Sequence, residues 1–118
     1  MSPTERSLKH LRQQGYLAQV TERWNSFAGI RQDLFGFIDI LAVRDGETLA
    51  IQTTSGSNVA ARKAKLLSLP AVEQCLGAGW SVTIHGWAKH KVKRGGKAYK
   101  FELRTLGITA KDYEPEPF

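Results

Sequence analysis

Hydrophobic and polar positions follow two periods along the chain, and the changes of period divide it into short elements. Near the amino end, leucines three positions apart mark one face of a helix, and Ser2 followed by Pro3 is a typical helix start. Elsewhere apolar residues alternate with polar ones or form short runs, as they do in strands. The pattern predicts helices at 2–15, 59–67 and 70–76, and strands at 16–24, 37–43, 48–54, 80–85 and 99–106.

The segments between these elements determine the topology. Asp45–Gly46 is a strong signal for a tight hairpin, so the strands on either side of it are expected to pair antiparallel. The helix at 59–67 is a crossover, which allows the fourth strand to run parallel to the third. Lys93–Lys97, with two central glycines, is expected to form a second hairpin tip. We predict a loop or extended link at 25–36, one domain over 1–110, and an irregular tail over 111–118.

Composition narrows the class of protein. The chain of 118 residues has the length of one domain, and its single cysteine, Cys75, excludes an internal disulfide framework and fits a reducing compartment. No apolar run approaches the roughly 20 residues that a membrane crossing needs. Met1–Glu5 lacks the apolar stretch of a signal peptide, so we expect a cytoplasmic protein without a membrane partner.

The net charge is +6, and the excess of positive charge is concentrated in one part of the chain. Between Gly56 and Arg104 there are ten basic residues and only two acids, Glu73 and Glu102. A one-sided basic region suggests a phosphate backbone as partner, and a plain solvated surface is the alternative. The ten basic residues are Arg62, Lys63, Lys65, Lys89, Lys91, Lys93, Arg94, Lys97, Lys100 and Arg104.

Asp39 is the most informative residue, because it interrupts an otherwise apolar strand. An unpaired buried carboxylate costs several kcal/mol or more, so such a residue is usually paired, protonated or bound to a metal. The next strand becomes polar at its end, where Gln52 and Thr54 share one face. Across a short hairpin the start of one strand lies beside the end of the next. We therefore expect Asp39, Gln52 and Thr54 to meet at one edge of the sheet.

This arrangement resembles the PD-(D/E)xK nuclease superfamily, and most closely its Holliday-junction-resolvase-like branch. Asp39 matches the first acid of the family motif, and Gln52-Thr53-Thr54 occupies the position of its acid-x-lysine triplet. The resemblance implies a restriction-endonuclease-like α/β fold, a mixed sheet flanked by helices with a helix-strand-strand-strand-helix-strand core. It also implies Mg²⁺- or Mn²⁺-dependent hydrolysis of phosphodiester bonds in DNA, possibly branched or junction DNA.

The resemblance assigns roles to particular residues. Asp39, the Gln52 side chain and the Thr53 carbonyl would hold the metal, and Thr54 would occupy the place of the catalytic lysine. Three further acids, Asp33, Glu22 and Glu5, are candidate ligands. Because threonine supplies no cation, Lys63 or Lys65 on the following helix would replace the lysine. The candidate DNA contacts are Arg31, Arg62, Lys63, Lys65, Lys93, Arg94 and Lys97.

Each assignment has a structural alternative. Asp39 could be a buried aspartate paired with an arginine, and Glu5 could serve only to cap the first helix. Replacement of the motif's acid and lysine leaves open a catalytically degraded DNA-binding relative, and a basic protein–protein interaction module is a third reading. Two scissile strands in a junction invite two sites, so the resemblance also implies a homodimer.

Overall fold

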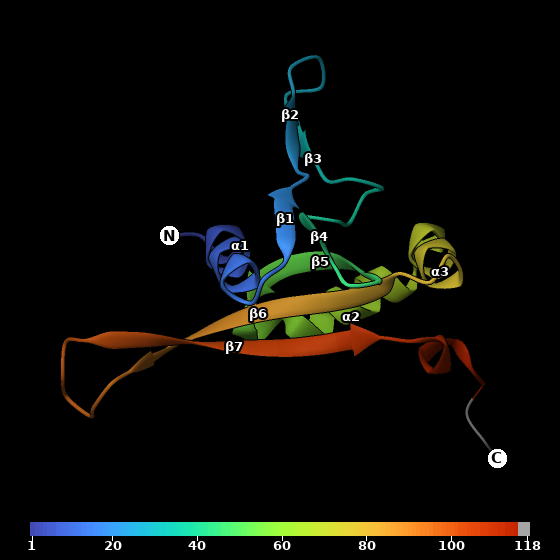
Figure 1. The fold of residues 1–118 in the computed structure, drawn as a ribbon. Coiled ribbons are helices and arrows are strands. Elements are labelled where there is room, and N and C mark those ends of the chain that lie inside the picture. Colours follow the sequence, from blue (N-terminus) through green and yellow to red (C-terminus); the bar gives the residue numbers. More distant parts are fainter. Residues whose placement is uncertain (116–118) are drawn as a thin grey trace.

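A five-stranded mixed sheet forms the centre of the protein, and helices cover both of its faces (Figure 1). The computed structural model describes residues 1–115. The strand order in the sheet is β1-β4-β5-β6-β7, and β2 and β3 form a separate two-stranded sheet. The strands are β1 (Leu17–Val20), β2 (Arg23–Asn25), β3 (Ile30–Gln32), β4 (Ile40–Arg44), β5 (Glu47–Ser55), β6 (Ser81–Lys91) and β7 (Tyr99–Ile108). The helices are α1 (Pro3–Gln13), α2 (Val59–Leu67) and α3 (Pro70–Gly77), with short 3₁₀ helices η1 (Gly56–Asn58) and η2 (Ala110–Tyr113).

The predicted α/β class, with a mixed sheet flanked by helices, is confirmed. β4 and β5 pair antiparallel through the predicted hairpin, where Asp45 and Gly46 have φ angles of 41° and 80°. Two consecutive positive φ angles are typical of the type I′ turn that matches strand twist. β5 and β6 pair parallel across the crossover, and α2 has the bounds that the sequence predicts.

Successive residues of β5 face two separate hydrophobic cores. Ala50 packs with Leu66 of α2 and Val72 of α3, whereas Ile51 packs with Leu11 of α1. Because successive side chains of a strand point to opposite faces, α1 covers one face of the sheet while α2 and α3 cover the other. The end of β5 therefore lies between two helical layers.

Gly86, in the middle of β6, lets the start of α2 lie close to the sheet. A Cβ atom at this position would be 2.3 Å from Val59 Cγ2 and 3.3 Å from Gly56 Cα. Any side chain at 86 would push η1 and α2 away from β6, and with them the α2 residues that face the end of β5.

The segment predicted as one strand, 16–24, is divided between two sheets. β1 ends at Val20, and the chain then leaves the main sheet. Two hydrogen bonds fix Thr21 at this point: its backbone N–H donates to Asp39 O at 2.9 Å, and its hydroxyl donates to Ile38 O at 2.7 Å. Residues 23–32 form a projecting hairpin of β2 and β3, which we call the β2–β3 arm (Figure 1). The sequence predicted a loop or extended link over 25–36; the structure instead pairs Asn25 of β2 and the whole of β3 into this small sheet.

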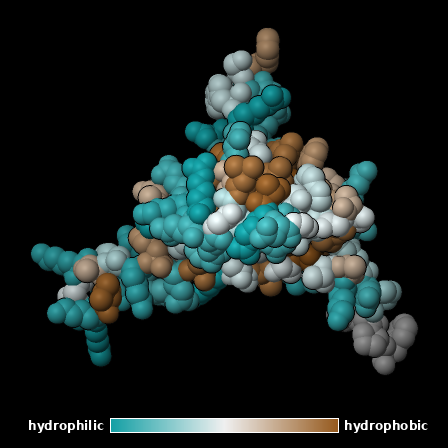
Figure 2. All heavy atoms as spheres, viewed as in Figure 1, coloured by the Kyte–Doolittle hydropathy of each residue, from teal (hydrophilic) through white to brown (hydrophobic). Residues whose placement is uncertain are grey.

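β6 and β7 continue beyond the end of the main sheet. The last residue pair of β5 with β6 is Ser55 with Trp87, and beyond it β6 and β7 pair only with each other. We call residues 88–102 the basic arm; it ends in the predicted 93–97 tip, and hydrophilic side chains gather over it (Figures 1 and 2). The two arms give the chain a radius of gyration of 15.7 Å, against roughly 13–14 Å for a compact domain of this length.

The carboxyl end is more ordered than predicted. Residues 110–113 form η2, which begins with a capping box between Thr109 and Asp112, and Tyr113 packs against the larger core. The predicted irregular tail is therefore wrong at 111–113, and its last residues, 116–118, lie outside the described part of the chain. Within residues 1–115, no helix combines the length and apolar composition that a membrane crossing requires.

Candidate functional site

A polar cleft of about 260 Å³ opens where β5 ends, between the start of α1 and the side of α2. Its walls come from segments that are far apart in the sequence: the first turn of α1, both bases of the β2–β3 arm, the entry to β4, the end of β5, and α2. The lining residues are Pro3, Thr4, Glu22, Asp33, Asp39, Gln52, Thr53 and Arg62.

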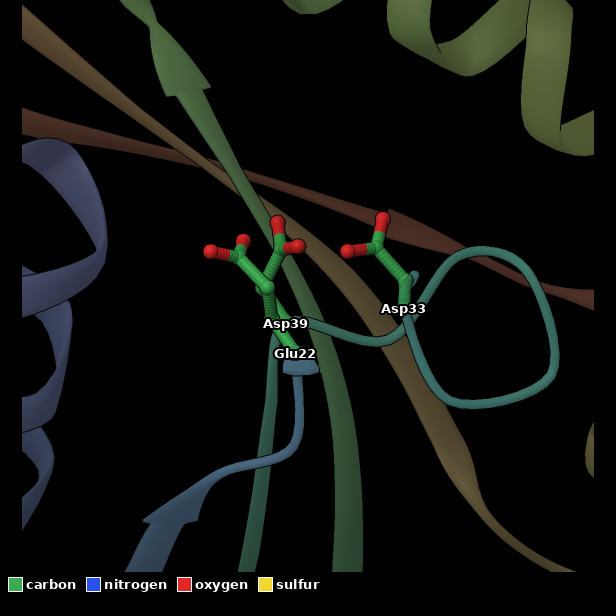
Figure 3. Close-up of side chains that lie close together, drawn as sticks. All are labelled: Glu22, Asp33 and Asp39. Atoms are coloured by element: carbon green, nitrogen blue, oxygen red, sulfur yellow. The ribbon is translucent and has the colours of Figure 1, made fainter. Parts of the chain in front are cut away.

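Three carboxylates converge in this cleft. Glu22, Asp33 and Asp39 each offer one carboxylate oxygen, and these oxygens all lie within 4.8 Å of one another. Glu22 and Asp33 flank the β2–β3 arm, and Asp39 directly precedes β4 (Figure 3). Two of the three acids that the sequence offered as further metal ligands are thus beside Asp39.

Asp39 is held in one orientation by β5. Its Oδ2 accepts the Thr53 backbone N–H at 2.8 Å and the Thr53 hydroxyl at 3.2 Å. The Thr53 hydroxyl lies 2.7 Å from the Thr4 hydroxyl of α1. Because the Thr53 proton goes to Asp39, the Thr4 hydroxyl is the donor in that contact. These bonds occupy one carboxylate oxygen and leave the other for a ligand in the cleft.

The pKa of Asp39 is raised to about 7, chiefly by burial and to a smaller extent by the neighbouring Asp33, while the hydrogen bonds from Thr53 act in the opposite direction. The neighbouring Glu22 is ion-paired with Arg31 of β3. Without a cation in the cleft, Asp39 therefore keeps its proton at a pH where an exposed aspartate is ionised.

Gln52 supplies an oxygen that has no partner within the described residues. The side chain is 2% exposed, and its Nε2 donates to Phe37 O at 3.2 Å. Its Oε1 is buried and accepts no hydrogen bond from residues 1–115. An unsatisfied buried acceptor costs about 1–3 kcal/mol. Three carboxylates and one amide oxygen form an all-oxygen donor set, which fits a hard divalent cation such as Mg²⁺.

Arg62 is the cation in the cleft. It is half-buried, and it forms no ion pair with any residue of the described 1–115. The next residue, Lys63, points elsewhere: its Nζ lies 3.1 Å from Asp112 Oδ1 of η2. Successive residues of a helix point about 100° apart, so only one of this pair can face the cleft. Lys65 is exposed on α2 and does not line the cleft.

Two other candidate residues also lie outside the cleft. Thr54 is buried in register with Gly86 and is not among the residues that line the cleft. Glu5 is exposed on the side of α1, beside Leu8 and Lys9. Its backbone N–H is capped by Ser2 at 3.2 Å, as the sequence predicts.

The candidate DNA contacts are spread over several surfaces. Lys93, Arg94 and Lys97 are exposed at the tip of the basic arm. Arg31 is exposed on β3 and holds Glu22 at the edge of the cleft. The basic arm therefore offers unshielded positive charge, whereas the charge of Arg31 is partly compensated.

The sequence was compared with protein-family models and with curated proteins. No protein-family model matches the sequence, and no curated protein matches it either. The argument for a function therefore rests on the cleft and on the charge of the surrounding surface.

Proposed function

We propose that this protein is a metal-dependent nuclease that hydrolyses phosphodiester bonds in DNA, on a fold of the restriction-endonuclease-like kind. The observation that carries the proposal is the convergence of three carboxylates in a cleft that is also lined by Gln52, whose buried side-chain oxygen has no partner within residues 1–115. Neither alone would suffice, since clusters of acids are common at surfaces. Together they form a donor set for a hard cation next to an arginine that has no carboxylate partner within residues 1–115.

The residues divide the work by their chemistry. Asp39, Asp33, Glu22 and Gln52 would hold the cation. A bound Mg²⁺ or Mn²⁺ supplies Lewis acidity, which polarises a phosphate and lowers the pKa of a water molecule. Thr53 fixes the direction of the Asp39 carboxylate. Arg62 would offset the charge that develops on the phosphate oxygens, in the role that the resembling family gives to a lysine.

The resemblance to Holliday-junction resolvases favours branched DNA as the substrate. A homodimer would place one cleft at each of the two DNA strands that are cut. The positive charge of the basic arm supports DNA as the partner, because phosphate contacts dominate the affinity of such complexes.

A cleavage panel tests the proposal. Linear duplex, single-stranded, flapped and four-way DNA are incubated with Mg²⁺, Mn²⁺ or EDTA, and we expect cleavage only with metal. Gln52→Glu restores the acid of the family motif and is expected to leave activity equal or higher. If neither the parent nor Gln52→Glu cleaves any substrate with either metal, the protein is a DNA-binding relative with a degraded site.

Metal binding should be visible without any activity. A cation that binds the folded state stabilises it by mass action and relieves repulsion among the three carboxylates. We expect Mn²⁺ and Mg²⁺ to raise the melting temperature of the parent at pH 8, and Asp33→Asn to reduce that rise strongly. Differential scanning fluorimetry in metal and in EDTA measures the effect. Glu5→Gln, an acid outside the cleft, is the matched control and should respond as the parent does; an equal rise in the Asp33 variant would place the metal elsewhere.

The basic arm should carry part of the salt dependence of DNA binding. Reversal of Lys93, Arg94 and Lys97 to glutamate is expected to weaken binding and to flatten the plot of log K against log salt, because each phosphate contact contributes a slope of about −0.9. The triple exchange Lys93→Arg, Arg94→Lys and Lys97→Arg preserves charge and should bind as the parent does. Fluorescence anisotropy with duplex and junction DNA measures the affinity of each variant. Unchanged binding of the charge-reversed variant at every salt concentration would exclude the arm tip as a contact surface.

A further inference from the structure

A second groove lies between α1 and the root of the basic arm, on a different face of α1 from the cleft. It holds about 360 Å³ and shares no lining residue with the cleft. Pro3 and Thr4 of α1 line the cleft, whereas Met1 and Arg6 line the groove. Its walls combine cations with aromatic rings, among them Arg6, Lys9, Trp87, Tyr99, Lys100 and Phe101.

The floor of the groove is one face of a two-stranded ribbon. Lys89 pairs with Phe101 and Lys91 with Tyr99 across the strands, so each ring stands opposite a lysine on the same face. The Arg6 guanidinium carbon lies 3.3 Å from the centre of the Phe101 ring, and Lys89 Nζ lies 4.2 Å from the centre of the Tyr99 ring. Tyr99 remains 48% exposed and Phe101 38% exposed, although both rings are large and apolar.

The two walls are fixed relative to each other. Ser7 of α1 accepts the Trp87 indole N–H at 2.8 Å, and its own hydroxyl lies 3.0 Å from Nδ1 of His85. Ser7 and His85 are both buried. These bonds pin α1 to β6 at the base of the groove, so its shape is formed before any ligand arrives, and a preformed site loses less entropy on binding.

The chemistry of the groove fits one class of ligand. Its lining carries the cations Arg6, Lys9 and Lys100 and no carboxylate within the described residues. A ligand that satisfies both cations and exposed rings must be anionic and must have flat apolar faces. Single-stranded nucleic acid has both, whereas the bases of a duplex are stacked on one another and offer only phosphates to such a surface.

We propose that this groove binds an unpaired strand of nucleic acid, with bases stacked on Tyr99 and Phe101 and phosphates at Arg6, Lys9 and Lys100. The groove would then favour DNA with an unpaired segment, such as a flap or an open branch, as the substrate of the cleft. This part of the inference rests on the proposed nuclease function. Because Pro3 and Thr4 of the cleft are neighbours in the chain of Met1 and Arg6 of the groove, one strand that passes the start of α1 could reach both.

The test is equilibrium binding of a fluorescein-labelled dT₁₂ oligonucleotide in EDTA, measured by anisotropy at several salt concentrations, with a blunt 12-base-pair duplex beside it. Tyr99→Thr with Phe101→Thr removes both rings and keeps residues that favour strands. Loss of base stacking is expected to weaken dT₁₂ binding at least about tenfold, with less than about a twofold change for the duplex. Trp24→Thr with Phe27→Thr is the matched control, because it removes two exposed aromatic rings from the other arm.

A second variant, Arg6→Gln with Lys9→Gln, removes two cations from the α1 side of the groove and is also expected to weaken dT₁₂ binding. It replaces the Tyr99 and Phe101 variant as the test if that variant misfolds. The inference is overturned if both groove variants bind dT₁₂ as the parent does, if the ribbon variant loses duplex affinity equally, or if the control variant loses as much. A parent that cleaves DNA while the groove variants bind normally refutes the groove alone. A parent that never cleaves but shows the selective loss refutes the nuclease and keeps the groove.

Discussion

Asp39→Asn is expected to reduce metal-dependent cleavage strongly while leaving the apo-protein folded and, at pH 8, more stable than the parent. Asparagine keeps an oxygen that can accept the Thr53 N–H, so the contact that orients residue 39 survives. The change removes the buried negative charge beside Asp33 and with it an anionic oxygen that a hard cation needs. We expect the cleavage rate to fall by roughly 10²–10³-fold, as for loss of one strong stabilising group in an active site, with DNA binding in EDTA unchanged.

The same substitution should change how stability depends on pH. The pKa of Asp39 is about 7 in the folded protein and ordinarily 3.8. Between these values the folded state keeps a proton that the unfolded chain has released, so the free energy of unfolding falls as pH rises from about 4 to 7. Asp39→Asn should remove this decline, which urea unfolding at pH 5, 6, 7 and 8 in EDTA would measure. An unfolded Asp39→Asn protein would indicate a structural role instead, and one that cleaves like the parent would remove Asp39 from the site.

Arg62→Ala is expected to reduce cleavage by about 10²-fold or more, whereas Lys63→Ala should leave it within about threefold of the parent. The two residues are adjacent on α2 and carry the same charge. Only Arg62 lines the cleft, and Lys63 is paired with Asp112. Both side chains of this pair keep contact with solvent, where an ion pair adds little to stability, so Lys63→Ala is a control that should fold normally.

Single-turnover cleavage with saturating protein separates the chemical step from binding. Arg62→Lys provides a second comparison, because it keeps the charge and loses the planar fork of donors. We expect it to recover part of the rate lost in Arg62→Ala. Equal losses in Arg62→Ala and Lys63→Ala would mean that α2 contributes only general positive charge, and the assignment of Arg62 to the cleft chemistry would then fail.

The main sheet could be predicted because its sequence signals are local and agree with one another. Apolar alternation, the Asp45–Gly46 turn and the crossover helix each indicate the same topology. The β2–β3 arm could not be predicted, because neither of its three-residue strands packs against a core and the pair leaves no periodic pattern. Its course matters for the site, since it brings both Glu22 and Asp33 to Asp39 although these two acids are eleven positions apart in the chain.

The choice between Arg62 and Lys63 shows a second limit. Val59 and Leu66 mark the buried side of α2, and positions 62 and 63 border that stripe on either side. Helical periodicity therefore predicts that both are half-exposed without telling which one turns toward the end of β5. Thr54 shows a third limit, because sharing a strand face with Gln52 does not bring it within reach of the cleft.

The β2–β3 arm joins the rest of the protein through two short connections, and each connection carries one carboxylate of the cleft, Glu22 on the way out and Asp33 on the way back. The cleft therefore lies at the base of the arm, and the position of the arm sets the spacing of two of its three carboxylates. A cation held by Glu22, Asp33 and Asp39 would tie both connections to the entry of β4 and so stiffen the base of the arm. A change in the angle of the arm would therefore change the distances among the carboxylates, and a ligand that fixed those distances would also fix the arm.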